Sequence, residues 1–115
     1  MKNILFVCSA NKERSKTAED YFSSLYPDAN FNSCGTNINL CKKEGTNPIT
    51  ADLITWGDII FVMEDKHAKV VKQHASVKSD NKLIVLGIHD VYTYYQKELI
   101  KILEAKCLEH FSISY

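Results

Sequence analysis

The stretch that decides the fold is Cys8-Ser-Ala-Asn-Lys-Glu-Arg14-Ser15, which lies between an apolar run and a helical pattern. The apolar run, residues 4–7, leads directly into Cys8 and predicts a buried strand. After Ser15, apolar residues recur at the 3.6-residue period of a helix, and no breaker interrupts them before Tyr26. A strand therefore ends at the cysteine and a helix begins near the arginine. This order places the first unpaired N–H groups of a helix around a thiol.

Such an arrangement suits a nucleophilic thiolate that attacks a phosphoryl group. The positive end of a helix dipole favours the thiolate form of a cysteine beside it. Arg14 is the only arginine in the sequence. Its planar guanidinium can hold two oxygens of a tetrahedral oxyanion, which a lysine cannot do. Cys8 is therefore the candidate nucleophile and Arg14 the candidate phosphate ligand. The alternative is a buried core cysteine followed by a surface arginine.

The residues between Cys8 and Arg14 are candidates for binding phosphate through their backbone N–H groups. They are Ser9, Ala10, Asn11, Lys12 and Glu13. A ring of inward N–H groups requires at least one residue at positive φ, and this loop contains no glycine. Asparagine tolerates positive φ better than its neighbours here, so we expect it at Asn11. Ser15 could donate a hydrogen bond to the Cys8 sulfur and assist its later departure, or it could simply be the helix N-cap.

The order of apolar segments and helical patterns predicts the fold class. A single domain over residues 1–115 should contain a doubly wound, four-stranded parallel α/β sheet with helices on both faces. Strands are expected at residues 4–7, 30–34, 59–63 and 82–86. Helices are expected at residues 16–26, 50–56, 64–74 and 99–111. Residues 36–47 show no periodicity and are expected to form a loop, and residues 76–81 a connector.

Acidic residues follow two of the predicted strands, at the sheet edge where α/β proteins bind ligands. Glu64 and Asp65 come after the third strand, and Asp90 comes after the fourth. The leaving oxygen needs a proton and a water must later lose one, and Asp90 is our choice for both steps. Its rivals are Glu64 and Asp65, and the alternative role of Asp90 is to cap the last helix. Tyr92 could form a wall of the pocket and stack on an aromatic substrate, or be a half-buried surface tyrosine.

Composition argues against several other classes of protein. The net charge is zero, so nothing favours binding to nucleic acid or to an anionic membrane. No apolar run approaches the roughly 20 residues of a membrane span and no signal pattern is visible, so a cytoplasmic protein is expected. The cysteines lack metal-ligand spacing, so neither a metal nor another cofactor is expected. The histidines, which form no cluster, are expected to be solvated; they are His67, His74, His89 and His110.

Together these motifs resemble the low molecular weight protein tyrosine phosphatases. The Cys-x5-Arg-Ser stretch follows a Leu-Phe-Val strand, as it does in that family. Ser33-Cys-Gly-Thr36 resembles the family's Ser-Ala-Gly-Thr, Trp56-Gly-Asp-Ile-Ile-Phe-Val-Met-Glu64 resembles its third strand, and Asp90-Val-Tyr92 resembles its Asp-Pro-Tyr. The resemblance implies hydrolysis of phosphotyrosine proteins or small aryl phosphates through a phosphocysteine. It also implies that the acidic residue after the third strand is auxiliary.

The sequence also departs from the family pattern. Ala10 replaces a glycine, and Glu13 stands where many members carry a second cysteine. Cys34 could serve as a redox partner of Cys8 if the second strand lies beside the first, although a small core residue is the simpler interpretation. The segment after Thr36 is shorter than in full-size members and lacks their aromatic wall, which predicts a compact member with a more open pocket.

Two other functions stay open at this point. Arsenate reductases share the fold and the loop, but they need resolving cysteines, and none lies between residues 42 and 106. A phosphate-binding module without turnover would keep Arg14 and the ring of amides, but it would have no need of Asp90. The oligomeric state cannot be predicted from the sequence.

Overall fold

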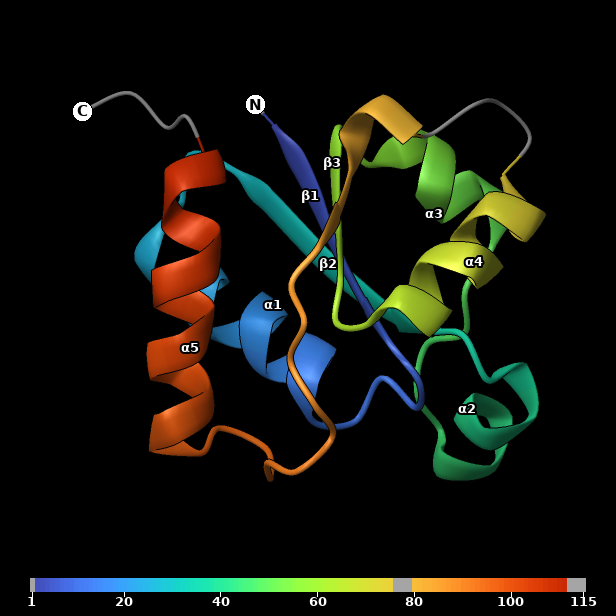
Figure 1. The fold of residues 1–115 in the computed structure, drawn as a ribbon, viewed down its shortest axis with the longest axis horizontal. Helices are drawn as coiled ribbons and strands as arrows, with labels where there is room; N and C mark the ends of the chain where they lie inside the picture. Colours follow the sequence, from blue (N-terminus) through green and yellow to red (C-terminus); the bar gives the residue numbers. More distant parts are fainter. Residues whose placement is uncertain (1, 76–79, 112–115) are drawn as a thin grey trace.

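A computed structural model describes residues 2–75 and 80–111, and these residues contain a four-stranded parallel sheet (Figure 1). The strands are β1 (Asn3–Cys8), β2 (Asn30–Gly35), β3 (Ile59–Val62) and β4 (Leu83–Val85). Their order across the sheet is β2-β1-β3-β4, and all three neighbouring pairs are parallel. The chain thus starts at β1, moves outward to β2 and returns to the other side at β3. This reversal places a crevice beyond the carboxyl end of β1.

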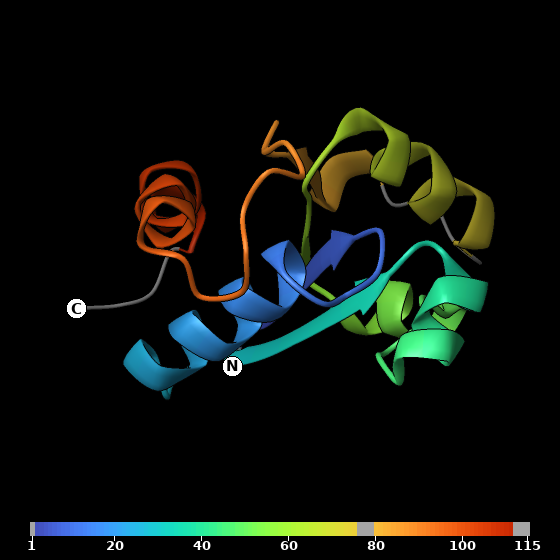
Figure 2. The same cartoon turned by 90° about the horizontal axis from the view of Figure 1, so that it is seen from below.

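Helices cover both faces of the sheet, which confirms the predicted fold class. They are α1 (Arg14–Leu25), α2 (Ile38–Glu44), α3 (Ala51–Trp56), α4 (Asp65–His74) and α5 (Lys97–Cys107), with short 3-10 turns at Asp80–Lys82 and Leu108–His110. Helices α1 and α5 lie on one side of the strands, and α3 and α4 lie on the other (Figures 1 and 2). None of the helices in the described residues is long and apolar enough to cross a membrane.

The central strand β1 is buried on both faces because its side chains alternate between two separate clusters. Phe6 stacks on Phe61 with ring centroids 5.3 Å apart and on Phe22 of α1 at 5.8 Å. Leu5 and Val7 point the other way, into the cluster that α3 and α4 complete. Residues 4–7 are fully buried, and burial of this kind contributes about 1.5–3 kcal/mol for each large apolar side chain. The strand is therefore a rigid support for Cys8 at its end.

The expected loop over residues 36–47 is wrong, because this segment contains helix α2. Asn37 is its N-cap, and its side-chain oxygen accepts the backbone N–H of Leu40 at 3.1 Å. Gly45 ends the helix with a φ of 71°, in the left-handed region where glycine carries no steric cost. Cys41 is the buried residue of the helix. An N-cap asparagine and a capping glycine were thus the local signals for this helix.

Smaller differences concern element ends. Strand β4 is shorter than expected, because Lys82 belongs to a 3-10 turn and its Nζ donates to the carbonyls of Ile54 at 2.7 Å and Gly57 at 2.8 Å. Helix α5 begins at Lys97, two residues before the predicted start, and ends at Cys107. Part of the expected connector, residues 76–79, lies outside the described residues.

Candidate active site

The segment between β1 and α1, which we call the phosphate loop (residues 8–14), lies at the carboxyl edge of the sheet. Cys8 is the last residue of β1 and its side chain is buried, and Arg14 is the first residue of α1. A pocket of about 50 Å³ opens here, the size of a small anion. It is lined by Cys8, Ala10, Lys12, Glu13, Arg14 and Asp90. The structure therefore brings the thiol, the guanidinium and the carboxylate after β4 to one small hollow.

Arg14 is the largest of the fully buried side chains in the described residues, with 2% exposure. Its Nη1 donates to Glu64 Oε2 at 2.5 Å and to the carbonyl of Ile88 at 2.8 Å, which engages both hydrogens of that nitrogen. The opposite edge, formed by Nε and Nη2, is the one that can hold two anion oxygens. The hydrogen bond from Arg14 lowers the pKa of the Glu64 carboxyl below its ordinary value. Glu64 thus serves to orient the guanidinium.

Asn11 adopts a φ of 55°, as expected, and its side chain is buried. Its amide nitrogen donates to Ser15 Oγ at 2.9 Å and to Ser33 Oγ at 2.8 Å. Ser15 Oγ lies 2.9 Å from Cys8 Sγ. Because the Ser15 hydroxyl accepts from Asn11, its own proton is available for the sulfur. The N-cap alternative for Ser15 is wrong, since Glu13 occupies that position.

The end of β2 and the residues that follow α2 contact the phosphate loop and hold it in place. Thr46 Oγ1 donates to the carbonyl of Ala10 at 2.5 Å, and the backbone N–H of Asn47 donates to Asn11 Oδ1 at 3.1 Å. At Gly35 the two backbones approach so closely that an added Cβ would lie 2.5 Å from the carbonyl oxygen of Ser9. Sequence reasoning missed Ser33, Thr46 and Asn47, because their part in the site arises only when β2 pairs with β1.

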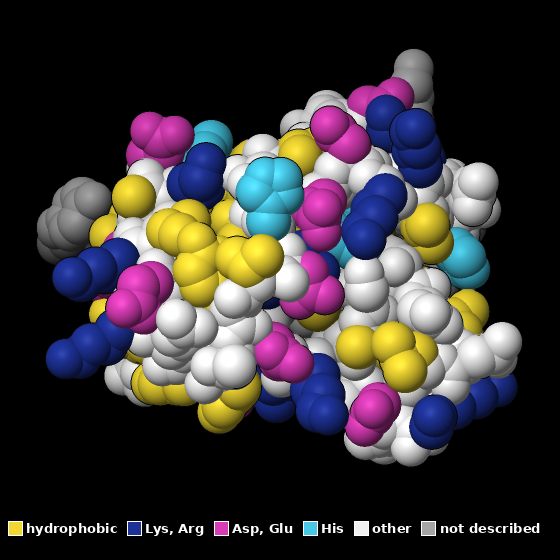
Figure 3. All heavy atoms as spheres, turned by 60° about the horizontal axis from the view of Figure 1, so that its bottom comes forward, with side chains coloured by type: hydrophobic (Ala, Val, Ile, Leu, Met, Phe, Trp, Pro, Cys, Tyr) yellow, Lys and Arg dark blue, Asp and Glu magenta, His cyan; other side chains and the backbone are white. Residues whose placement is uncertain are grey.

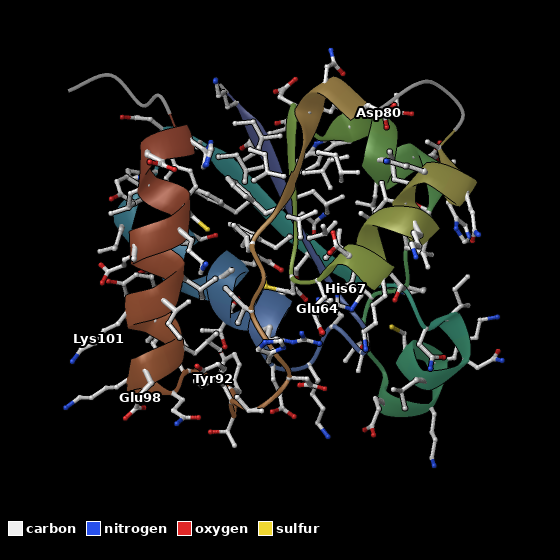
Figure 4. All side chains as sticks on the ribbon, in the orientation of Figure 1. Glu64, His67, Asp80, Tyr92, Glu98 and Lys101 are labelled. Atoms are coloured by element: carbon white, nitrogen blue, oxygen red, sulfur yellow. The ribbon has the colours of Figure 1, made fainter. Side chains whose placement is uncertain are left out.

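His67 is not solvated, and the prediction was wrong for this histidine. It is 1% exposed, and its Nε2 lies 2.9 Å from the hydroxyl of Ser9 (Figure 4). Its Nδ1 accepts the backbone N–H of Glu64 at 3.0 Å. Burial lowers the pKa of His67 to about 4. A signal was present, because His67 is the third residue of a helix that starts beyond β3, the strand next to β1.

Asp90 and Tyr92 lie in the segment from 86 to 96, which we call the acid loop. The side chain of Asp90 is 63% exposed, and its Oδ1 lies 3.6 Å from Arg14 Nε. Tyr92 is half-buried and packs against the cluster under α1 and α5, and it is not one of the residues that line the pocket. The structure therefore brings Asp90 to the site and leaves Tyr92 outside the pocket. Asp65 is exposed.

The rim of the pocket is polar. Its outer residues are Lys12, Glu13 and Asp90, and Lys12 Nζ lies 3.4 Å from a carboxylate oxygen of Glu44. Acidic and basic side chains are interspersed on this face of the molecule, beside groups of hydrophobic ones (Figure 3). Within residues 2–75 and 80–111, no cluster of histidine, cysteine and acidic side chains could hold a metal ion.

Cys34 lies beside the end of β1, but its side chain faces away from the site. It pairs in register with Val7 and packs in the cluster under α3 and α4, whereas Cys8 belongs to the opposite cluster. Burial raises the pKa of the Cys34 thiol, so this thiol is a poor nucleophile and a core role is favoured. The four cysteines are all free.

The sheet order and the anion-sized pocket between Cys8 and Arg14 define a class: α/β proteins with a Cys-x5-Arg phosphate loop. No protein-family model matches the sequence, and no curated protein does. Solved structures match well. The tyrosine phosphatase Wzb from Escherichia coli K30, in complex with phosphate, aligns over 91% of this chain and 92% of its own, with 23% identity and a TM-score of 0.72.

Two further solved structures are similar to this chain over most of its length. The tyrosine phosphatase AmsI from Erwinia amylovora covers 91% of this chain and 87% of its own, with 24% identity and a TM-score of 0.71. A low molecular weight protein tyrosine phosphatase from Bacillus subtilis covers 88% and 91%, with 22% identity and a TM-score of 0.66. The chain therefore has the fold of the low molecular weight protein tyrosine phosphatases, and the resemblance seen in the sequence is confirmed at the level of fold.

Proposed function

We propose that this protein is a phosphatase that hydrolyses phosphotyrosine or other aryl phosphate monoesters through a phosphocysteine. One observation carries the proposal: the Cys8 sulfur and the Arg14 guanidinium line the same pocket of about 50 Å³. A thiol, a guanidinium and the N-terminus of α1 at one hollow form a site for a tetrahedral anion with a nucleophile at its base. The structural likeness to tyrosine phosphatases supports the same reaction.

In the first step, the Cys8 thiolate attacks phosphorus and the ester oxygen leaves. Arg14 binds two of the nonbridging oxygens through its Nε and Nη2 edge, and the backbone N–H groups of the phosphate loop bind around them. The Ser15 hydroxyl, 2.9 Å from the sulfur, stabilises negative charge there when the sulfur leaves in the second step. Asn11 fixes the direction of that hydroxyl.

Asp90 donates a proton to the leaving oxygen and later accepts one from the attacking water. Its position on the rim of the pocket, in contact with solvent, is suited to both transfers. Glu64 is a poor proton donor because the hydrogen bond from Arg14 lowers the pKa of its carboxyl. Asp65 is exposed at the start of α4 and does not line the pocket.

The arsenate reductase alternative is not favoured. Reduction of arsenate requires further thiols that can reach the first one and collect electrons. Cys34, Cys41 and Cys107 are all buried, and burial raises the pKa of the thiols of Cys34 and Cys107. These three side chains are better described as small core residues.

The direct test is hydrolysis of p-nitrophenyl phosphate by the wild type and by Cys8→Ser and Asp90→Asn. We expect Cys8→Ser to abolish turnover and Asp90→Asn to reduce kcat by roughly 10²- to 10⁴-fold. Asp65→Asn is the matched control, an exposed carboxylate at the same edge of the sheet, and should stay within about threefold of wild type.

The remaining outcomes are also informative. Full activity of Asp90→Asn would transfer the acid role to Glu64 or Asp65. Turnover by Cys8→Ser would overturn the proposal, and arsenate-dependent oxidation of a thiol reductant would support a reductase instead. Phosphate binding without turnover would leave a binding module. EDTA should not change the rate, because Arg14 and the loop amides carry the charge compensation.

A further inference from the structure

His67 is a buried titratable side chain beside the pocket that the reaction described above does not use. It belongs to α4, yet the two nitrogens of its ring contact two different segments. Nδ1 contacts the backbone N–H of Glu64, which is the N-cap of α4 after β3, and Nε2 contacts the side chain of Ser9 in the phosphate loop. A histidine on the first turn of α4 thus joins the loop that holds the nucleophile to the segment that holds Glu64.

The two contacts determine the tautomer of the ring. A backbone N–H can only donate, so Nδ1 of His67 must be the acceptor for Glu64. The ring proton of the neutral imidazole is then on Nε2, which donates it to Ser9 Oγ. Burial and the positive charge of Arg14 lower the pKa of His67 to about 4, so the ring is neutral near pH 7.

The same contacts connect to the guanidinium. The carboxylate of Glu64 accepts from Arg14 Nη1 at 2.5 Å, while the backbone N–H of Glu64 is held by His67. The His67 imidazole therefore links Ser9, which follows the nucleophile, with Glu64, which orients the Arg14 guanidinium. Ser9 and Arg14 lie near opposite ends of the phosphate loop. The distance between them therefore depends on the contacts through His67 and Glu64 as well as on the backbone of the loop.

We propose that His67 is a positioning residue of the phosphate loop, which acts through its hydrogen bond to Ser9 and sets the loop for anion binding. This inference rests on the proposed phosphatase function. When the bond is removed, Ser9 and its neighbouring amides lose their fixed direction. The loop must then be reordered on each binding event, so phosphate binds more weakly and kcat/KM falls.

Two substitutions separate the bond to Ser9 from the bond to Glu64. The amide oxygen of His67→Asn can replace Nδ1 and keep the contact with Glu64, but it cannot reach Ser9. The amide nitrogen of His67→Gln can replace Nε2 and keep the contact with Ser9. We expect His67→Asn to lower kcat/KM by roughly 10- to 100-fold and His67→Gln to restore most of it, since one buried hydrogen bond to a positioned group has about this effect.

Ser9→Ala removes the same bond from the other side and leaves α4 unchanged. It should lower kcat/KM about as much as His67→Asn, and the double variant should be no worse than either single one, because both remove one interaction. His74→Asn is the matched control, a half-buried histidine at the far end of the same helix that does not line the pocket. It should leave kcat/KM unchanged.

Two readouts do not require turnover. Titration with inorganic phosphate, followed by NMR or calorimetry, should show weaker binding to His67→Asn and Ser9→Ala than to wild type and His67→Gln. Nitrogen-15 NMR of the wild type should show the ring proton on Nε2 at pH 7. A proton on Nδ1 would overturn the inference together with the contact to Glu64, because a protonated Nδ1 cannot accept the backbone N–H. Impairment of His67→Gln with full activity of His67→Asn would overturn the inference and leave a helix-capping role.

The failure of this inference can be told apart from failure of the proposed function. Hydrolysis by the wild type together with full activity and full phosphate affinity of His67→Asn would overturn the role of His67 alone. Phosphate binding that is weakened in His67→Asn, in a protein without turnover, would keep the role of His67 and overturn the phosphatase. Absence of phosphate binding by the wild type would overturn both.

Discussion

The phosphate loop and the acid loop meet at the same pocket but are held in opposite ways. In the phosphate loop, Asn11 and Arg14 are 3% and 2% exposed. The side chains of Ser33 and Glu64 and the backbone of Asn47 and Ile88 hold them by hydrogen bonds. In the acid loop, Val91 is 73% exposed and the Asp90 side chain 63%. The acid loop is held at its two ends. The N–H groups of Leu86 and Ile88 donate to the carbonyls of Val62 and Met63, and the Tyr95 N–H donates to Thr17 Oγ1 at 2.9 Å.

This difference corresponds to two parts of the proposed reaction. Binding of a charged group benefits from donors that are fixed before the substrate arrives, since no free energy is then lost in ordering them. Proton transfer to a leaving group and from water needs contact with both substrate and solvent. Substitutions in the phosphate loop and its supports should therefore change activity and stability strongly, whereas substitutions of exposed, uncharged residues in the acid loop should do little.

The largest effect in this comparison is expected for Arg14→Lys. An ammonium group keeps the charge but cannot hold two anion oxygens while it also bonds to Glu64 and the carbonyl of Ile88. We expect kcat/KM for p-nitrophenyl phosphate to fall by about 10³-fold. Lys12→Ala, which removes an exposed cation from the same rim, should cost less than tenfold. Similar losses for the two variants would contradict a fixed guanidinium as the main phosphate ligand.

Gly35→Ala tests whether the close contact between the end of β2 and the phosphate loop holds the loop in place. The new methyl group would lie 2.5 Å from both the Ser9 carbonyl oxygen and Cys41 Sγ, so the loop must shift. We expect roughly 1–3 kcal/mol of destabilisation and weaker binding of inorganic phosphate. The matched control is Gly57→Ala, where the nearest atoms are 3.3 Å away on Leu5 and Ile60, away from the loop. Unchanged phosphate affinity in Gly35→Ala would contradict the claim that the phosphate loop is held in a fixed shape by its neighbours.

The support that His67 gives to the phosphate loop predicts a pH dependence of stability. Because the folded pKa of His67 is about 4 and the ordinary value is 6.5, the unfolded chain takes up a proton in this window and the folded chain does not. The free energy of unfolding should therefore fall as the pH is lowered from about 6.5 to about 4, by up to about 3 kcal/mol.

Urea titrations across this range would measure the effect. His67→Gln should show a flatter pH dependence than the wild type. The lowered pKa of Glu64 adds a further loss of stability at still lower pH, because its pairing with Arg14 is present above the ordinary carboxyl pKa and disappears as the carboxyl is protonated. Equal slopes for wild type and His67→Gln would contradict a buried neutral imidazole.

The smallest effect is expected for Val91→Ser in the acid loop. Val91 is the most exposed of the large hydrophobic residues that the structure describes, so its replacement removes little packing. The free energy of unfolding should change by less than about 0.5 kcal/mol, and kcat for p-nitrophenyl phosphate by less than about threefold. A tenfold loss of kcat would show that the acid loop is held more tightly than its exposure indicates.

Local patterns were sufficient to predict the sheet and the centre of the site. The apolar run before Cys8 and the helical period after Ser15 identify the turn between strand and helix, and the choice of Asn11 for positive φ follows from the absence of glycine. These features depend on neighbours in the chain. The place of Asp90 could also be predicted, because it lies in the segment that follows the fourth strand and therefore at the same edge of the sheet.

The supports of the phosphate loop could not be predicted in the same way. His67 contacts Ser9 across 58 positions of the chain, and Thr46 contacts Ala10 across 36. A histidine on a mostly polar helix is usually solvated, and only the pairing of β3 with β1 places this one against the loop. Helix α2 is a different case, because its caps at Asn37 and Gly45 were visible in the sequence.

The most direct test of the account is to trap the covalent intermediate at Cys8. In Asp90→Asn, p-nitrophenolate can still leave without a proton donor, but water lacks its base, so the intermediate should accumulate. Acid quenching during turnover, followed by digestion and mass spectrometry, should show a phosphate adduct on the peptide that contains Cys8. An unmodified Cys8 peptide in a protein that still releases p-nitrophenol, or an adduct on another residue, would contradict the account.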